Sequence, residues 1–457
     1  MESYSKSIGE FVSALNLAQV PEAVVAKAKL VFLDTLGVAL ASSTMDFGAM
    51  ASKVAATLGG ATRSIVIGSP YRVAAANAVI ANGTLAHGLD YDDTLEEAIV
   101  HTGSCAWMSA LAVGEEVGAN GKSVLEAAIA ATEVLCKIGL VAPGKFHARG
   151  FHPTAICSTF GAAAAAGKLY GLTSAQWVDA FGLCGSQSSG IIEYLADGTW
   201  TKRMHPGWSA HGGVIACLLA REGFRGPAKV FEGTHGFFSS FGGKNDYRFE
   251  KLVELGQEWE IPKLAFKSYP CGSISHPYMD CALKIKQKHA PTPDEISEVL
   301  CRTAEGPVHR LWEPLADKQK PVSSYGAKFS LPYSIAVMLV HGRAGLEEFT
   351  DAAINDAAVL RLAGKVRYVL DPTIDYPRHF SGHVKVIMAD GRIFEENQPH
   401  PRGGLEDPLP PSEIEEKFRA NARLALPAGQ VDDIVVTVGR LEQISSLSIL
   451  TDKLIPR

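Results

Sequence analysis

Three aspartates fall within four positions in the segment HGLDYDDT, residues 87–94. If the apolar helix expected before this segment continued through it, side chains three, four and seven positions apart would share one face: His87, Asp90, Tyr91 and Thr94. Asp92 and Asp93 would then point away from that face. A straight helix cannot aim three carboxylates at one metal ion, so the three aspartates need not share one role. Asp90 could belong to a pocket on the shared face, while Asp92 and Asp93 cap or solvate a helix end. The alternative is that Asp90 only pairs with a neighbouring side chain.

Histidines stand beside the expected starts of four helices. Three precede a proline, a residue favoured in the first helical turn, and the fourth precedes an apolar helical run: His152, His205, His276 and His101. Backbone N–H groups at a helix start attract anions, and a positive helix end helps to keep a neutral histidine base available near pH 7. Cations lie close to two of these starts, namely Lys202, Arg203 and Lys267. The pattern favours a pocket for a small anion with several carboxylates, and a plain helix cap is the alternative for any single histidine.

Motifs for cofactor or metal chemistry lack the required spacing. The segment GAAAAAGKL, residues 161–169, is similar to a phosphate-binding loop, but five residues separate its glycines and Leu169 stands where a hydroxyl would hold magnesium. We expect it to be helical. A glycine-rich dinucleotide fingerprint after a strand is missing from the sequence, and the eight cysteines form no Cys-x-x-Cys pair. The sequence therefore predicts no cofactor and no metal.

Composition places the chain among ordinary globular proteins. Apolar residues make up 47% of its 457 residues and charged residues 20%. The formal net charge of −6 does not favour nucleic acid or an anionic membrane as a partner, and the sequence contains no uncharged apolar run long enough for a membrane span. Unpaired cysteines in apolar runs and an N-terminus without a signal-peptide pattern indicate a reducing compartment. We expect a cytoplasmic protein.

The pattern of apolar residues changes once along the chain. From about residue 20 to 240, apolar residues recur at helical spacing, with many alanines and glycines on the faces. After about residue 265, EISEVLCRTAE and VRYVLDP predict strands, and VKVIMADGRIFEE predicts a hairpin around Asp390-Gly391. A Pro- and Gly-rich stretch, 398–411, precedes a helix that Ser412 and Glu415 should cap. We predict a mostly α fold: a large all-helical domain, residues 1–264 completed by 405–457, with a smaller α+β lid domain, 265–404, inserted before the C-terminal helices.

Ordered segments across nearly the whole chain resemble the MmgE/PrpD family. They are HGLDYDDT, VHTGS, GFHPTAICSTFGAAAAAGKLYGL, ADGTWTKRMHPGWSAHGG, KSYPCGSISH, FSLPYSIAVML and EEKFRANA. The family includes 2-methylcitrate dehydratase, cis-aconitate decarboxylase and iminodisuccinate epimerase. The resemblance implies a metal-free enzyme, usually a homodimer, with a helical domain and a lid-like α+β domain.

The resemblance also implies roles for individual residues. It assigns catalytic positions to Asp90, His101, His152, Lys202, Lys267 and Tyr333, and a substrate-binding position to Thr94, with His276 and Lys328 as further candidates. Arg203 and His205, from the helix-start pattern, complete the predicted binding set. We hypothesise that the lysines and helix starts bind carboxylates and stabilise the charge that builds as a proton leaves. A histidine, His101 or His152, would move the proton, Asp90 would orient a histidine or donate a hydrogen bond, and Tyr333 could act as a second acid.

Two departures leave the substrate open. The loop after Thr94 carries Glu96 and Glu97, and it continues His101-Thr102-Gly103-Ser104 where dehydratases and decarboxylases are expected to carry His-Pro-Ser or a similar sequence. We expect a lyase acting on a small di- or tricarboxylate, first of all a hydro-lyase like 2-methylcitrate dehydratase. The alternatives are a cis-aconitate-type decarboxylase, an iminodisuccinate-type epimerase and a non-catalytic polycarboxylate-binding protein. A homodimer is expected, without nucleic acid or membrane partners.

Overall fold

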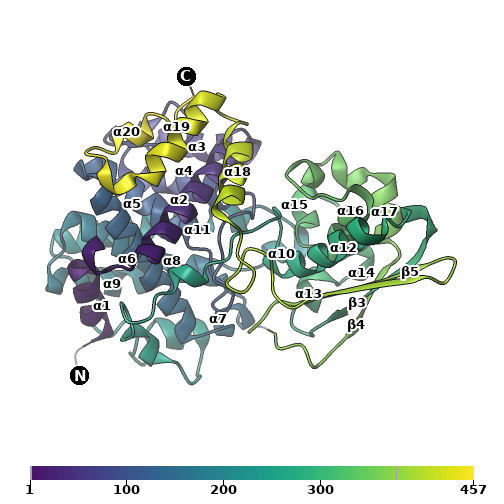
Figure 1. Ribbon diagram of the computed structural model, residues 1–457. Coiled ribbons are helices and arrows are strands. Elements are labelled where there is room, and N and C mark those ends of the chain that lie inside the picture. The colour runs from purple at the N-terminus through teal and green to yellow at the C-terminus, as the bar shows by residue number, and fades with distance from the viewer. Residues whose placement is uncertain (1–2, 377, 457) are drawn as a thin grey trace. The chain divides into compact units, whose positions relative to one another are not determined.

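The computed structural model describes residues 3–376 and 378–456 (Figure 1). The chain forms two compact units. Unit 1 comprises the residues up to Ile192, Thr201–Leu264 and the chain from Pro410 onward, and unit 2 comprises Glu193–Trp200 and Ala265–Leu409. Helices predominate and the strands form small sheets, which confirms the predicted mostly α fold with a smaller α+β part. Within the described ranges, none of the helices is both long and apolar enough to cross a membrane.

Unit 1 is built almost entirely of helices. They are α1 (Tyr4–Ala14), α2 (Glu22–Ser43), α3 (Asp46–Leu58), α4 (Ala75–His87), α5 (Gly103–Val117), α6 (Gly121–Val141), α7 (Lys145–Ala148), α8 (Pro153–Tyr170), α9 (Ser174–Gln187), α11 (Thr201–Arg221), α18 (Pro411–Ala422), α19 (Ala428–Gly439) and α20 (Ser448–Thr451). A short antiparallel ribbon joins β1 (Ser64–Ile65) to β2 (Arg72–Val73). The GAAAAAGKL segment lies in α8, as predicted, and its alanines are fully buried.

Small residues let the central helices of unit 1 approach closely. A Cβ atom on Gly83 of α4 would lie 2.5 Å from the Cα of Gly207 on α11, so only glycine fits at this crossing. The crossing lies near the C-terminal end of α4 and the N-terminal half of α11. It therefore brings His87, the last residue of α4, into the neighbourhood of the first turns of α11.

Unit 2 is an α+β unit around one four-stranded sheet. Its strands are β3 (Ile296–Thr303), β4 (Val366–Leu370), β5 (Gly382–Met388) and β6 (Ile393–Gln398), in the order β4-β3-β5-β6. Only the β3–β4 pair is parallel. The helices are α10 (Tyr194–Asp197), α12 (His276–His289), α13 (Val308–Leu311), α14 (Leu315–Gln319), α15 (Ser324–Ala327), α16 (Leu331–His341) and α17 (Ala357–Ala363). Strands and hairpin appear where the sequence predicts them, with Gly391 at φ +89° in the β5–β6 turn.

Two local expectations differ from the structure. Helix α18 begins at Pro411 with Pro410 at its N-cap, so the cap predicted from Ser412 and Glu415 is wrong. Proline at the first helical position has φ already set for a helix, and this starts the helix two residues earlier without a side-chain cap. The segment Glu193–Trp200 belongs to unit 2 although helical sequence surrounds it. Its assignment depends on tertiary contacts that local patterning does not encode.

Candidate active site

The aspartate-rich segment is a loop, not the continuation of a helix. Helix α4 ends at His87, and Asp90 has φ +54°, a left-handed conformation that is unfavourable for residues with a side chain. The predicted helix face shared by His87, Asp90 and Thr94 is therefore wrong. The turn starts at Gly88. Residue 88 must be glycine because a Cβ atom there would overlap the ring of Phe47, which packs against this end of α4.

A lysine from helix α18, far along the chain, holds this loop. Lys417 Nζ donates to the backbone carbonyl of Tyr91 at 2.8 Å, pairs with Asp34 Oδ1 at 2.8 Å and lies 3.7 Å from the centre of the Tyr91 ring. Lys417 belongs to the EEKFRANA segment. A strained backbone such as that of Asp90 persists only where its surroundings over-determine it, and this clamp at the next residue is one such constraint.

Asp90 makes a buried ion pair with Lys202. The Lys202 Nζ and Asp90 Oδ1 atoms are 2.7 Å apart, and neither residue is more than 5% exposed. Lys202 lies in the first turn of α11, 112 residues further along the chain. Because low-dielectric surroundings strengthen this attraction, the pair fixes the position of the ammonium group that the sequence predicts to bind carboxylates.

Asp93 caps helix α5. Its carboxylate accepts hydrogen bonds from the backbone N–H groups of Thr102 at 3.0 Å and Gly103 at 2.8 Å, and from the Thr102 hydroxyl at 2.5 Å. Burial, and then the neighbouring Asp92 carboxylate, raise the pKa of Asp93 to about 6. This structural role agrees with the prediction for Asp93. It also means that the start of α5, expected to be open to a substrate anion, already holds a carboxyl group.

We expect Gly103→Ala to lower the free energy of unfolding by about 1–3 kcal/mol, the usual effect of overpacking a buried position. A Cβ atom at residue 103 would overlap Thr35 Oγ1 and Asp93 Oδ1, so the cap of α5 must shift. Urea denaturation of the variant measures the loss. Gly429→Ala in α19 is the matched control, because nothing lies within 4 Å of its added Cβ. Equal stability of the Gly103 variant and wild type would contradict the crowding described.

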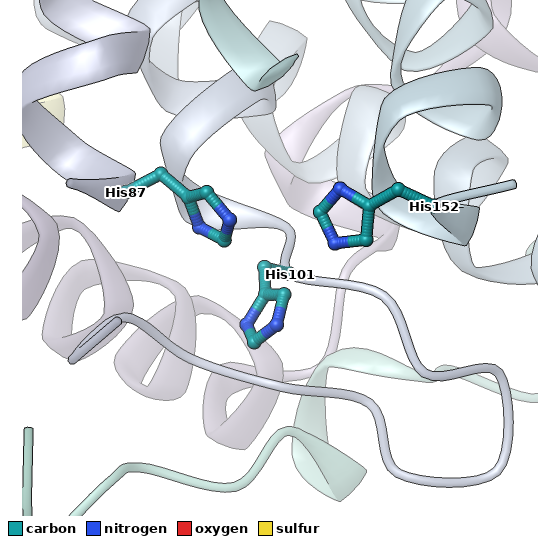
Figure 2. A group of neighbouring side chains, drawn as sticks. All are labelled: His87, His101 and His152. Atoms are coloured by element: carbon teal, nitrogen blue, oxygen red, sulfur yellow. The ribbon is translucent and has the colours of Figure 1, made fainter. Parts of the chain in front are cut away.

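Three buried histidines meet at the centre of the site: His87, His101 and His152 (Figure 2). Their ring centroids are separated by 4.8 Å for His87–His101, 5.7 Å for His87–His152 and 6.3 Å for His101–His152. The rings come from the end of α4, the loop before α5 and the residue before α8, respectively. Two of the three, His101 and His152, are predicted site residues that the fold brings together.

The hydrogen bonds of His101 define its tautomer. Its Nδ1 lies 2.8 Å from the backbone carbonyl of Asp93, which can only accept, so Nδ1 carries the hydrogen. Thr94 Oγ1 lies 3.0 Å from the same nitrogen. The backbone N–H of His101 donates to Thr154 Oγ1 at 3.1 Å, which ties the loop to α8. In the neutral ring, Nε2 is then the proton-accepting nitrogen.

His152 is held in the neutral form. Its Nδ1 lies 3.1 Å from Nδ1 of His205. The pKa of His152 lies well below its usual value, first because burial disfavours the charged ring and then because of repulsion from neighbouring groups, namely His205, Lys202, His87 and His101. Burial, followed by repulsion from His87 and Lys202, lowers the pKa of His205 to about 4. Near pH 7 the His152 ring is therefore an uncharged base.

The helix-start prediction is correct for three of the four histidines. His152 immediately precedes α8, His276 begins α12, and His101 lies two residues before α5. His205 does not start a helix, because α11 begins at Thr201 and contains Pro206 in its second turn. A proline this near a helix start displaces few backbone hydrogen bonds. The longer helix places Lys202 and His205, three residues apart, on one face.

Side chains that could hold a metal ion coincide with the histidine cluster. Among the described residues, the only group of three or more candidate ligands is this cluster, and the candidate ligand atoms of its members lie within 4.8 Å of one another. A tetrahedral zinc site would require nitrogen ligands about 3.4 Å apart at zinc–nitrogen distances of about 2.0–2.1 Å. The Lys202 ammonium, close enough to lower the pKa of His152, also opposes a second cation. The arrangement therefore suits proton transfer between neutral imidazoles better than metal binding.

Arg203 and Glu97 contact other side chains of unit 1. The Arg203 guanidinium lies 4.1 Å from the centre of the Phe47 ring and is mostly buried. Glu97 pairs with Arg248 at 2.7 Å, and both side chains are about half exposed. Glu97 therefore points outward, which removes one of the two acidic groups expected to oppose an anionic substrate.

The remaining predicted residues lie in unit 2. His276 Nε2 lies 3.4 Å from the carbonyl of Cys271, and Lys328 Nζ donates to the carbonyl of Pro270 at 2.6 Å. These two side chains thus converge on one short segment, and Lys267, three residues before it, is buried. The Tyr333 hydroxyl donates to the carbonyl of Glu348 at 2.7 Å, and burial raises its pKa. This hydrogen bond would have to open before Tyr333 could act as an acid.

His87 and Asp92 were not among the predicted functional residues. His87 Nδ1 lies 2.8 Å from Asp92 Oδ2, and both side chains are fully buried. Residues five positions apart do not face each other on a straight helix. The prediction that the helix continues through residues 87–94 therefore did not pair His87 with Asp92. Gly88 is the signal that could have revealed this pair, because glycine often ends a helix. A turn at that position lets the Asp92 carboxylate fold back onto the His87 imidazole.

Comparison with known proteins gives full-length matches. The family profile of the MmgE/PrpD N-terminal domain matches residues 6–250, and that of the MmgE/PrpD C-terminal domain matches residues 269–443. A cis-aconitate decarboxylase-like protein, oryM, of Aspergillus oryzae is 27% identical over 96% of this chain and 94% of its own. The human cis-aconitate decarboxylase is 26% identical over 99% of this chain and 94% of its own. The mitochondrial 2-methylcitrate dehydratase of Yarrowia lipolytica is 25% identical over 89% of this chain and 82% of its own.

Proposed function

The chain belongs to the MmgE/PrpD family, and on that premise we propose that it is a lyase that moves a proton at a carbon next to a carboxylate of a small di- or tricarboxylate. The observation that carries the proposal is the buried Asp90–Lys202 ion pair beside histidines, one of which has a strongly lowered pKa. A fixed cation and a neutral base close together are the groups that such a reaction needs.

Each group has a role that follows from its position. The Lys202 ammonium binds a substrate carboxylate and stabilises the negative charge that spreads onto it in the transition state. Asp90 holds that ammonium in place through the 2.7 Å contact. His101, with Nδ1 bonded to the Asp93 carbonyl, presents Nε2 to accept or return the proton. His152 is the second candidate for this role because it stays uncharged near pH 7.

Decarboxylation is the first reaction to test. Its support is the match to proteins named as cis-aconitate decarboxylases, which extends over 96–99% of this chain for the two described above. In that reaction CO2 leaves and the remaining charge spreads onto a neighbouring carboxylate. A histidine that has first taken up a proton from solvent then gives it to the carbon. Dehydration of a hydroxy-tricarboxylate is the second candidate, supported by the 89% coverage of the dehydratase match. There the histidine first removes a proton and the hydroxyl group leaves.

Proton NMR of the purified protein in D2O tests both reactions. The panel contains cis-aconitate, 2-methylcitrate, iminodisuccinate and other four- to seven-carbon acids. Loss of CO2 with deuterium uptake supports decarboxylation, and elimination with a new alkene signal supports dehydration. Deuterium exchange with inverted configuration and no loss of atoms makes the enzyme an epimerase instead. Tight binding of an acid without any exchange would overturn the lyase proposal in favour of a binding protein.

We expect activity to survive dialysis against EDTA. Lys202 and the histidines supply the charge stabilisation and the proton transfer, so the proposed chemistry does not need a metal ion. Turnover before and after dialysis, with metal content measured by mass spectrometry, checks this. One zinc ion per chain, with activity lost on chelation and restored by zinc, would contradict the expectation and assign the ion to the three histidines.

A further inference from the structure

His87 is the one member of the histidine cluster for which neither the sequence nor the proposed mechanism has a use. It is the last residue of α4 and is fully buried. Its ring packs against His101 at 4.8 Å and against His152 at 5.7 Å, the latter with only 30° between the ring planes (Figure 2). It therefore touches both candidate proton carriers.

The partner of His87 determines where its proton sits. The Asp92 carboxylate accepts a hydrogen bond from Nδ1 at 2.8 Å, so the neutral ring carries its hydrogen on Nδ1 and a lone pair on Nε2. This Nε2 is buried and has no hydrogen-bond partner among the described residues. Leaving a buried acceptor without a hydrogen bond destabilises the folded state, so a hydrocarbon side chain would suit a purely structural position better.

The spacing of the cluster allows a proton to pass through one water molecule. One ring nitrogen from each of His87, His101 and His152 lies within 4.8 Å of the other two. Two hydrogen bonds of about 2.8 Å on either side of a single water span a gap of this size. Asp92 also lies close to a second ring, because its Oδ1 is 3.7 Å from Nδ1 of His101. One carboxylate therefore faces two of the three imidazoles.

We propose that the Asp92–His87 pair is a proton store for the site, with His87 acting through His101 and His152 as a positioning residue. This inference rests on the proposed function. After a catalytic histidine takes a proton from the substrate or from solvent, the proton passes through a bridging water to His87 Nε2. The resulting imidazolium is paired with the Asp92 carboxylate. The proton returns by the same path to carbon or to a leaving hydroxyl. In decarboxylation it comes from solvent and ends on carbon, and in dehydration it comes from carbon and leaves in water, so His87 and the catalytic histidine end each cycle as they began and no electrons are transferred to or from them.

His87→Asn is the most informative variant. The asparagine amide can keep the hydrogen bond to Asp92 in place of Nδ1, whereas nothing replaces Nε2. The matched control is His211→Asn on α11, whose ring nitrogen Nδ1 bonds only to the backbone carbonyl of Ala76 among the contacts described for it. Steady-state kinetics, thermal melting and the response of the rate to added imidazole are measured for wild type and both variants.

We expect His87→Asn to lower kcat by about 10²-fold, the lower end of the range for a positioned acid–base group, and to change KM by less than twofold. Added imidazole should raise the rate of the variant but not that of wild type or His211→Asn, because a soluble proton carrier replaces the missing store. A folded variant with wild-type kcat overturns the inference. Parallel changes in kcat and KM without a response to imidazole also overturn it.

Asp92→Asn gives an independent test if the asparagine at residue 87 prevents folding. The amide removes the negative charge that would pair with the His87 imidazolium, so kcat should again fall while KM stays unchanged. An unchanged kcat would contradict the role of the Asp92–His87 pair as a proton store. The wild-type enzyme separates the two proposals. If wild type neither converts any acid of the panel nor exchanges its protons for deuterium, both the proposed function and this inference fail. If wild type is active and the variants match it, the inference alone fails.

Discussion

Replacement of Lys202 by alanine should lower turnover on the substrate by roughly 10²–10³-fold, the usual loss when one charged donor to a transition state is removed. The ammonium group is fixed 2.7 Å from Asp90 in a buried site, so it needs little rearrangement to meet charge developing on the substrate. Steady-state kinetics with the acid identified by NMR measures the loss. We expect most of it in kcat if the contact strengthens in the transition state.

Controls must separate this effect from simple destabilisation. Lys202→Ala leaves the Asp90 carboxylate buried without its cation, and breaking a buried pair from one side can cost about 3–5 kcal/mol of stability. The double variant Lys202→Ala/Asp90→Asn removes the uncompensated charge and should recover stability but not turnover. Lys122→Ala, at an exposed position in α6, should leave both unchanged. Near-normal turnover of a folded Lys202 variant would contradict the proposed role of the ammonium.

The second large effect is expected at His152. His152→Gln should lower kcat/KM by about 10²–10⁴-fold if this ring carries the proton, because an amide can hydrogen-bond but cannot act as a base. The wild-type pH profile checks the same assignment without a mutation. Protonation of His152 would abolish its action as a base, and its pKa lies well below 6.5. If the reaction begins with removal of a proton, as in dehydration or epimerisation, the acid limb of kcat/KM should therefore fall below pH 6.5. A limb at or above that value would contradict His152 as the base.

The same shifts link stability to pH. The folded-state pKa of His205 is about 4 and that of an unfolded histidine is about 6.5. Between these values the unfolded chain binds more protons, so the contribution of His205 to the free energy of unfolding decreases as pH falls. His205→Gln should lose less stability than wild type between pH 7 and pH 5 in urea denaturation. Equal losses of stability in the two proteins would contradict the lowered pKa of His205 in the folded state.

Local sequence patterns predicted much of the secondary structure, and the candidate site residues came from spacing together with the family resemblance. The strands of unit 2, the hairpin at Gly391 and the helical character of GAAAAAGKL each follow from short-range periodicity and turn chemistry. Asp90, Lys202, His101 and His152 follow from spacing and resemblance, and unit 1 brings these four into one neighbourhood. Such patterns are local, so the amino-acid order carries them directly.

Tertiary contacts decided where α4 ends and which groups the three aspartates contact, and the sequence did not predict these features. Phe47 against Gly88 and Lys417 at the Tyr91 carbonyl bring residues from both ends of the chain onto the aspartate loop, and neither contact has a signature near residue 90. The resulting turn gives Asp92 to His87 and Asp93 to the start of α5. Where a helix ends, and which group then meets a carboxylate, depends on packing between segments far apart in the sequence. That is why the sequence could mark one stretch of eight residues as a candidate site, whereas only the structure gave its three aspartates their separate partners.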